Sequence, residues 1–239
     1  MAYQSVFQRY EIKYLLTREQ KARMTAAMAP YMALDRYGRT TIRNVYFDTP
    51  NYRLIRRSME KPIYKEKLRI RSYQQARPGS EVFVELKKKY KGIVYKRRLS
   101  LPEQVAVDWM AGSPPPGEDS QIRREIDYFL KYYGALRPTV FLSYEREAYY
   151  CREGGDFRVT FDDNILCRRT DLSLEREVGG TSILPEGYVL MEIKCPGGIP
   201  LWMTALLTQE KLYKTSFSKY GMAYQTLIYP ECKEMFHYA

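Results

Sequence analysis

Four cations occupy alternate positions of one short segment. Residues 65–71 place Lys65, Lys67, Arg69 and Arg71 on one face of a β-strand. Neighbouring charges on such a face lie about 7 Å apart and repel by about 0.6 kcal/mol in water, or by about 2 kcal/mol at the effective dielectric of a protein cleft. On a solvated face this repulsion is small, so the meaning of the run depends on whether other strands repeat it.

Other segments do repeat the alternation. They are Arg9-x-Glu11-x-Lys13, Glu85-x-Lys87-x-Lys89, Lys96-x-Arg98, Arg158-x-Thr160-x-Asp162 and Glu192-x-Lys194. The opposite faces of several of these segments are apolar. Cations outnumber carboxylates on the charged faces, which is unfavourable unless an anion is present. We therefore expect a polyanionic ligand, with Glu85 and Glu192 as hard oxygen ligands for a Mg²⁺ or Mn²⁺ ion that bridges phosphate oxygens.

Period-two alternation predicts eight β-strands, at residues 8–15, 41–47, 64–73, 82–89, 94–101, 138–150, 157–162 and 188–194. Eight strands of this length are enough to close a barrel. Charged faces inside it would enclose water and a polyanion, because unpaired buried charge is unfavourable. A β-sandwich with one solvated face gives the same alternation. The excess of cations, and the helices available to cover the apolar faces, favour the barrel.

Four helices are predicted between the strands. Thr17 and Gln20 form a capping box that begins a helix ending near residue 29. Further helices are expected at residues 103–111, at 120–134 with Ser120 as the N-cap, and at 201–213. The predicted fold is α+β: an eight-stranded antiparallel β-barrel tunnel with helices packed outside, in a single domain over residues 1–239.

Composition limits which ligands and catalytic groups the protein can use. The net charge of +11 implies an acidic partner, which could be nucleic acid, an anionic membrane or a phosphorylated small molecule. The four cysteines show no CxxC spacing and the one histidine is His237, so zinc sites and Ser-His or Cys-His nucleophile pairs are not expected. No apolar run approaches the roughly 18 residues of a membrane span. We expect no signal peptide, reduced thiols and a cytoplasmic location.

Eight short motifs in order resemble the VTC domain, the catalytic domain of the vacuolar transporter chaperone polyphosphate polymerases and a branch of the triphosphate tunnel metalloenzymes. The resemblance covers nearly the whole chain. The motifs are Glu11-Ile12-Lys13-Tyr14, Val45-Tyr46-Phe47-Asp48-Thr49, Lys67-Leu68-Arg69-Ile70-Arg71, Val84-Glu85-Leu86-Lys87, Tyr144-Glu145-Arg146, Arg158-Val159-Thr160-Phe161-Asp162, Met191-Glu192-Ile193-Lys194 and Ser216-Phe217-Ser218-Lys219-Tyr220.

The resemblance implies an eight-stranded antiparallel tunnel that binds ATP or another nucleoside triphosphate and inorganic polyphosphate, and that requires Mn²⁺ or Mg²⁺. It implies phosphate contacts from one set of cations, and Glu192 as the metal ligand. That set is Lys13, Arg69, Arg71, Lys87, Arg146, Arg158, Lys194 and Lys219. Strand phase adds Lys65, Lys67 and Lys96 to the phosphate-binding set and Glu85 to the metal site. Arg69, Arg71, Arg146, Arg158 and Lys219 are the predicted catalytic residues, and Arg56 or Arg57 is a further candidate for the lumen.

Two features depart from the wider superfamily. Hydrolase branches begin with Glu-x-Glu-x-Lys, whereas the first acidic position here is Arg9. The loss of a metal-binding carboxylate favours polymerisation over multi-metal triphosphatase chemistry. The phosphate-sensing SPX domain and the membrane helices of the eukaryotic subunits are also missing from the sequence, so regulation and export would require other chains, such as a separate membrane partner.

Three other functions fit parts of the sequence. A tunnel that binds triphosphate and metal could hydrolyse its ligand, and a non-catalytic polyphosphate-binding module would need the same cations. The 23 tyrosines could stack bases in a single-stranded RNA binder. Tyrosine is favoured at half-buried strand positions, however, so nucleic acid is the least favoured partner.

Overall fold

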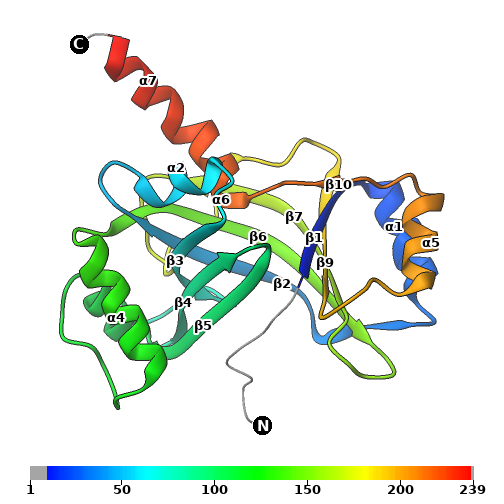
Figure 1. Ribbon diagram of the computed structural model, residues 1–239, viewed down its shortest axis with the longest axis horizontal. Coiled ribbons are helices and arrows are strands. Elements are labelled where there is room, and N and C mark those ends of the chain that lie inside the picture. The colour runs from blue at the N-terminus through cyan, green and yellow to red at the C-terminus, as the bar shows by residue number, and fades with distance from the viewer. Residues whose placement is uncertain (1–9, 238–239) are drawn as a thin grey trace.

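The computed structural model describes residues 10–237 and contains one large antiparallel sheet (Figure 1). Its strands lie in the order β10-β1-β9-β7-β6-β2-β3-β4-β5, with β8 beside β7. Their bounds are β1 (Tyr10–Thr17), β2 (Met32–Asp48), β3 (Tyr64–Ser72), β4 (Glu81–Tyr90), β5 (Ile93–Pro102), β6 (Arg137–Cys151), β7 (Arg158–Arg168), β8 (Thr181–Ser182), β9 (Tyr188–Cys195) and β10 (Lys214–Thr215). The eight long strands contain the eight predicted segments, apart from Gln8 and Arg9, which lie outside the described residues, and the predicted end positions Tyr73 and Phe157.

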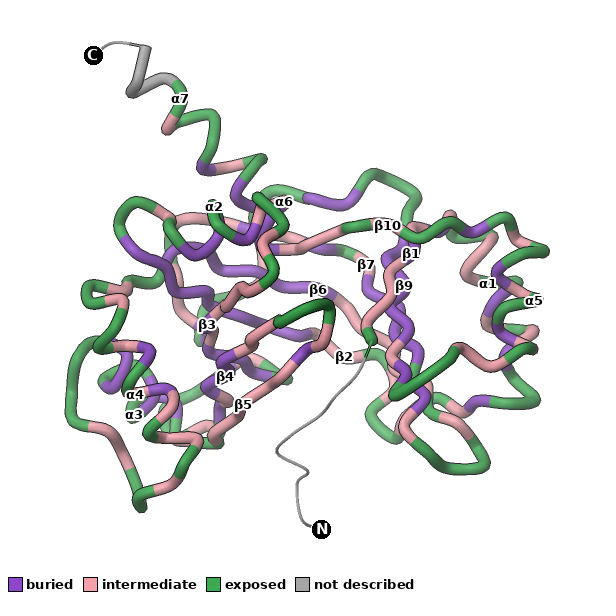
Figure 2. Tube along the Cα trace, viewed as in Figure 1, coloured by how far each residue is buried: buried purple, intermediate pink, exposed green. Residues whose placement is uncertain are grey.

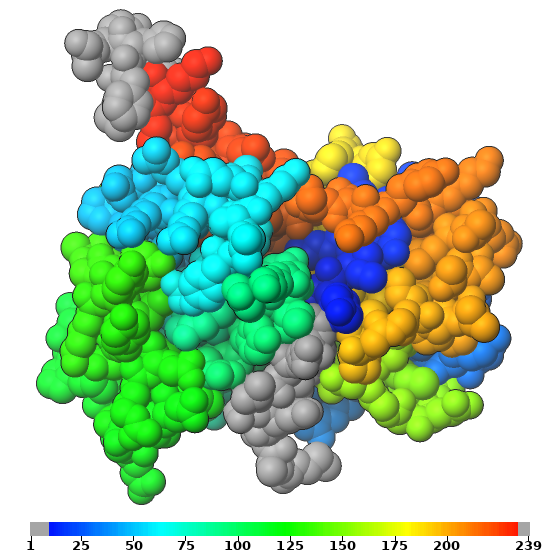
Figure 3. Space-filling view, viewed as in Figure 1, coloured from blue at the N-terminus to red at the C-terminus, as the bar shows by residue number. Residues whose placement is uncertain are grey.

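Helices lie between the strands. They are α1 (Arg18–Met28), α2 (Arg53–Met59), α3 (Glu103–Met110), α4 (Gln121–Tyr133), α5 (Leu201–Gln209), α6 (Lys219–Ala223), the π-helix η1 (Tyr224–Ile228) and α7 (Tyr229–His237). The Thr17–Gln20 capping box and the Ser120 N-cap are both present, as predicted. The helix predicted at 201–213 ends earlier, at Gln209. In Figure 3, α7 extends away from the body of the molecule.

The prediction of a closed eight-stranded barrel was wrong. Within residues 10–237, no ladder joins β5 to β1, so the sheet has two ends. The physical reason is that β10 occupies the free edge of β1, with Lys13 opposite Thr215 and Tyr14 opposite Lys214. In Figure 3 this segment (orange) lies directly above β1 (blue). A side-chain contact bridges the two arms of the sheet instead: Lys87 on β4 donates a 2.6 Å hydrogen bond to Glu11 on β1.

The outer face of the sheet packs against helices, as predicted. Val84 and Leu86 on β4 and Leu68 on β3 are buried with Trp109 of α3 and Phe129 of α4. On the other arm, the apolar faces of β1, β7 and β9 meet α1 and α5, and the buried stretches of these strands are purple in Figure 2. This alternation leaves the polar positions on the opposite face. We call the face that carries Arg69, Glu85, Arg146, Asp162 and Glu192 the inner face.

One end of the inner face is apolar and covered. Leu142, Tyr144 and Leu190 are buried there with Tyr220 of α6 and Ile228 of η1. The remaining part of the inner face carries the charged side chains. Among the described helices, none is long and apolar enough to cross a bilayer.

Strands β2 and β7 are longer than predicted because each contains an irregularity. The ladder between β2 and β6 shifts register between Leu34 and Arg39, and that between β6 and β7 shifts between Ser143 and Glu145. In β7 the shift coincides with Asn164, whose φ of 46° lies in the left-handed region. The irregularity breaks the period-two pattern, so that pattern ends at Asp162 although the strand continues.

Candidate functional site

A buried carboxylate, Glu85, is surrounded by four cations. Arg69 on β3 and Arg98 on β5 lie directly opposite it in the two ladders, and each donates a hydrogen bond of 2.8 Å from Nε. Lys96 also contacts Glu85, and Nε of Arg71 lies 3.7 Å from its Oε2. Burial opposes ionisation of Glu85, but Lys96, Arg71 and Arg69 hold its pKa well below the ordinary value. This cluster therefore has a net positive charge.

A second buried carboxylate, Asp162, holds two predicted catalytic side chains. Arg146 binds it through two hydrogen bonds of 2.6 and 2.7 Å, a bidentate geometry, and Lys219 donates one of 2.5 Å. Asp162 is fully buried. Because β6 and β7 pair Arg146 with Asp162, and α6 begins at Lys219, three separate parts of the chain meet at this one carboxylate.

Tyr144 connects the two clusters. Its ring lies 5.0 Å from the Arg146 guanidinium and 4.4 Å from Nζ of Lys219, and its hydroxyl accepts a 2.9 Å hydrogen bond from Arg71. Burial alone would raise the pKa of Tyr144, but the charges of Arg146, Arg71 and Lys219 lower it to about 8. The lowered pKa follows from the positive potential of these three side chains.

A third group lies across β1, β9 and β4. Glu192 is 3.0 Å from Nζ of Lys194 and 3.5 Å from Nζ of Lys13, while Glu11 accepts from Lys87. Burial opposes ionisation of Glu192, but Lys194, Lys13 and Lys87 hold its pKa well below the ordinary value. Glu11 lies near Glu192, and the negative charge of Glu192 acts to raise the pKa of Glu11. These are the two inner-face carboxylates whose neighbours are mainly lysines.

Lys67 lies between these groups and, among the described residues, pairs with no carboxylate. Its Nζ donates a 2.8 Å hydrogen bond to the hydroxyl of Ser218, at the N-cap of α6. Burial, and then the charges of Lys13 and Lys87, lower its pKa well below the ordinary lysine value. In register, Lys67, Lys87 and Lys96 stand side by side on three adjacent strands. Such a row is stable only if anions compensate it.

The start of α6 is fixed by a buried carboxylate at the end of β2. Asp48 accepts hydrogen bonds from the backbone N–H groups of Leu54 and Ile55 in α2 and from the Tyr220 hydroxyl at 2.8 Å. It thereby ties α2 and α6 together. Ser218 and Lys219 reach the inner face because this anchor holds the helix that carries them.

The structure leaves Arg158 outside the Asp162 cluster. Its side chain is 54% exposed, and Nε lies 3.6 Å from Asp156. It does face inward, because it lies opposite Lys194 in the ladder between β7 and β9. The predicted cation therefore lies at the rim of the inner face.

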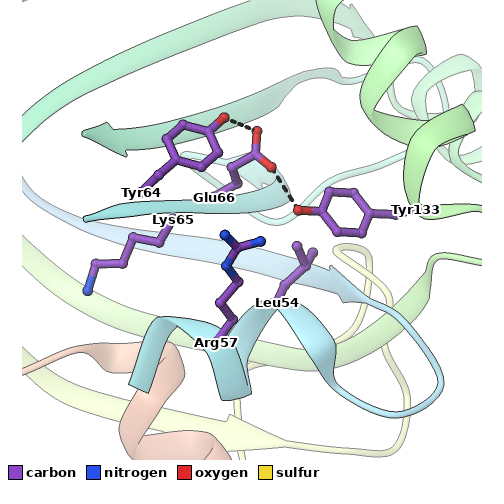
Figure 4. A pocket seen from close by; sticks show the side chains of 6 residues that line it. All are labelled: Leu54, Arg57, Tyr64, Lys65, Glu66 and Tyr133. Carbon is purple, nitrogen blue, oxygen red and sulfur yellow. Dashed lines mark hydrogen bonds between the residues drawn. The ribbon is translucent and has the colours of Figure 1, made fainter. Parts of the chain in front are cut away.

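Lys65 and Arg57 lie at the other end of β3. Figure 4 shows Lys65 pointing to one side of the strand, while Glu66 on the other side accepts hydrogen bonds from Tyr64 and Tyr133. Nζ of Lys65 is 3.2 Å from the Ser58 carbonyl. A cavity of about 10 Å³, enough for one water molecule, lies among these residues, and Arg57 lines it. Arg57 therefore belongs to the contact of α2 and α4 with β3.

The structure thus brings most predicted site residues together. Ten basic side chains and four carboxylates share the charged part of the inner face: Lys13, Lys67, Arg69, Arg71, Lys87, Lys96, Arg98, Arg146, Lys194 and Lys219, with Glu11, Glu85, Asp162 and Glu192. The prediction did not include Glu11, Tyr144, Arg98 or Asp162 as site residues. Tyr144, Arg98 and Glu11 each lie two residues from a predicted residue on the same strand face, and Asp162 lies four residues from Arg158, so strand phase could have identified them.

The carboxylates differ in their fitness for a metal ion. Glu85 is engaged by cations at both oxygens, which fits a metal ligand poorly. Glu192 and Glu11 are closer to the pattern in which Mg²⁺ takes one or two carboxylates and completes its coordination with phosphates and water. Within the described part of the chain, no three His, Cys, Asp or Glu residues gather into a metal-binding group.

Comparisons with known proteins agree on the fold. The family model of the VTC domain matches residues 8–228. A candidate adenylate cyclase from Bacillus halodurans is 15% identical, with a TM-score of 0.55 over 90% of this chain and 95% of that one. A candidate adenylyl cyclase from Hippeastrum, described as having a dominant triphosphatase activity, is 16% identical, with a TM-score of 0.51 over 90% and 93%. No curated protein matched.

Proposed function

This chain belongs to the VTC domain family, and we propose that it binds a nucleoside triphosphate and inorganic polyphosphate on its inner face and transfers the γ-phosphoryl group to the polyphosphate chain. The observation that carries the proposal is the set of ten cations gathered around four carboxylates, with the arginines already oriented by Glu85 and Asp162. Positively charged, preorganised side chains are what phosphoryl transfer requires of a protein.

The length of the basic surface supports a polymer. From Lys65 to Arg71 the inner-facing cations of β3 extend over about 20 Å, since a strand rises about 3.3 Å per residue. Lys89 lies opposite Lys65 in the ladder and continues the surface on β4. This span is longer than one triphosphate needs, and it suits a chain of phosphates bound along the strand.

In the proposed reaction, a terminal phosphate oxygen of the chain attacks the γ-phosphorus. A new P–O–P bond forms, the bond from the γ-phosphorus to the β–γ bridging oxygen breaks, and the nucleoside diphosphate leaves. Arg69, Arg71, Arg146 and Lys219 stabilise the charge on the moving phosphoryl group. The attacking oxygen is already an anion at neutral pH, so no general base is needed. This fits a site without histidine.

A divalent metal is part of the proposal, as Mn²⁺ or Mg²⁺. Glu192, with Glu11 beside it, is the residue we propose to hold it, in preference to Glu85. When bound, the metal would neutralise phosphate charge. Lys13 and Lys194, which contact Glu192, would keep that carboxylate ionised and oriented.

Hydrolysis is the second candidate function. The Hippeastrum protein, similar in fold, is described as a triphosphatase. A water molecule that replaces the attacking phosphate oxygen would give orthophosphate from the same site. A non-catalytic polyphosphate-binding module is the third, because it needs the same cations without turnover.

Product analysis separates these functions. The protein is incubated with ATP and Mn²⁺ or Mg²⁺, with a chelator as the control, and the products are resolved by chain length. Long polyphosphate supports the proposal, whereas orthophosphate alone identifies a hydrolase. If neither forms while polyphosphate raises the melting temperature, the chain is a binding module.

Triphosphate binding is expected to take up protons at pH 8. Burial and neighbouring cations lower the pKa of Lys67; burial acts the other way on Tyr144, but cations lower its pKa to about 8. A bound anion raises both pKa values, so affinity falls as the pH rises. Calorimetric titration in two buffers of different ionisation enthalpy measures the proton count. Net proton release would contradict the description of this site.

In the protein without ligand, Lys67 should make the free energy of unfolding increase with pH, whereas ligand affinity decreases with pH. Because folding lowers its pKa, the unfolded state binds more protons, and this group's contribution to the free energy of unfolding rises with pH up to the ordinary lysine pKa.

A further inference from the structure

Tyr150 lies in the row of side chains at the far end of the charged surface. It is opposite Arg158 in the ladder between β6 and β7, Arg158 is opposite Lys194, and Lys194 is opposite Glu11. Directly opposed residues share a sheet face, and Tyr150 lies four regular positions beyond Arg146 on β6. Its side chain therefore belongs to the inner face. In Figure 1 this end, at the β6–β7 hairpin, lies away from α6.

The ring of Tyr150 differs from the other inner-face tyrosines. Tyr46 stacks on Tyr220 at 4.7 Å, and Tyr144 is buried among cations. Tyr149, next in sequence but on the outer face, packs edge-on against Phe161. Tyr150 is 46% exposed and, among residues 10–237, has no hydrogen bond or ring contact. Packing of the fold does not explain this aromatic side chain.

Its neighbours indicate what the ring would bind. Arg158, directly opposite Tyr150, is 54% exposed, and Lys194, one strand further along the same row, is 19% exposed. An aromatic face beside two cations matches a nucleotide, which carries a planar base next to its phosphates. Inorganic polyphosphate, which has no base, would use the cations alone.

We propose that Tyr150 is the base-stacking residue of the nucleotide site, with Arg158 and Lys194 contacting the phosphate nearest the ribose. This inference rests on the proposed function. Tyr150 and Arg146 are separated by four strand residues, about 13 Å, which suits an extended triphosphate whose γ-phosphate reaches the Asp162 cluster. Stacking on one ring accepts any base, so ATP and GTP should bind similarly.

The test compares a nucleotide with the same phosphate chain lacking a base. A Tyr150→Thr variant suits the strand and removes the ring. We expect its Kd for a non-hydrolysable ATP analogue to rise about tenfold and its Kd for inorganic triphosphate to stay unchanged. Tyr150→Phe should retain wild-type affinity for both. Tyr132→Ala, which removes a 56% exposed ring on α4, is the matched control.

Equal weakening of both ligands, or unchanged affinity for the ATP analogue, would overturn the inference. Melting temperatures establish that each variant is folded, and if Tyr150→Thr is not, Tyr150→Leu replaces it. Because the readout is a difference between two binding constants, it does not depend on the reaction product. Failure of the polymerase proposal is seen separately, in the products of the wild-type protein.

Discussion

Replacing Arg69 and Arg71 together by alanine is expected to lower the rate of nucleotide-dependent phosphoryl transfer by at least about 10³-fold, since loss of one preorganised donor commonly lowers a rate by about 10²–10³-fold. Both side chains face inward from β3, where Arg69 contacts Glu85 and Arg71 contacts Tyr144. The measurement is the initial rate of product formation at saturating ATP and metal.

Arg97→Ala provides the matched control for the double variant. Arg97 lies next to Arg98 on β5 but faces outward, where its Nε lies 3.1 Å from Oε1 of Glu125 on α4. Its removal should leave the rate unchanged. Glu85 keeps Lys96 and Arg98 in the double variant, so the fold should persist. A folded double variant with wild-type activity would show that this strand does not contact the substrate.

Glu85→Gln is expected to lower stability strongly in the absence of ligand. Removal of one partner from a buried ion-pair group lowers the free energy of unfolding by about 3–5 kcal/mol. Here the loss leaves four cations facing one another around a neutral amide. For a chain of this size the melting temperature should fall by about 10 °C. Thermal unfolding followed by calorimetry measures it.

Polyphosphate should reverse much of this loss, because its negative charge replaces that of Glu85. Its addition should raise the melting temperature of Glu85→Gln more than that of the wild type. Glu125→Gln serves as the control: this carboxylate, 22% exposed against 1% for Glu85, pairs with Lys88 and Arg97 on the outer face, and its loss should change stability by about 1 kcal/mol or less. An unchanged melting temperature for Glu85→Gln would contradict the role given to the Glu85 cluster.

Strand phase predicted which side chains share the inner face, because alternation is a local property of the backbone. Lys67, Arg69 and Arg71 lie together for this reason. Alternation could not predict whether the sheet closes. Whether β5 or β10 pairs with β1 depends on the two-residue strand Lys214–Thr215, which is too short to show an alternating pattern. Helix α2 was also missed, because it has seven residues, its N-cap Tyr52 makes no side-chain cap hydrogen bond, and two of its first N–H groups are held by Asp48, five residues before its start.

The ion pairs that the site residues form were harder to predict than which residues lie in the site. Arg146 and Arg158 have the same residue type and share a face, yet Arg146 is held by Asp162 and Arg158 lies exposed at the rim. That difference arises from how far each lies from the end of its strand and from where α6 places Lys219. Neither is visible in the spacing of charges. The same holds for Glu85 and Glu192, which look alike in sequence but differ in how many arginines surround them.

Transfer of label from γ-³²P-ATP to a polyphosphate primer tests the central claim most directly. The protein is incubated with both and with Mn²⁺, and the chains are separated by length. The account predicts that label appears in chains longer than the primer, with one nucleoside diphosphate released for each phosphoryl group transferred. Label found entirely in orthophosphate would contradict it.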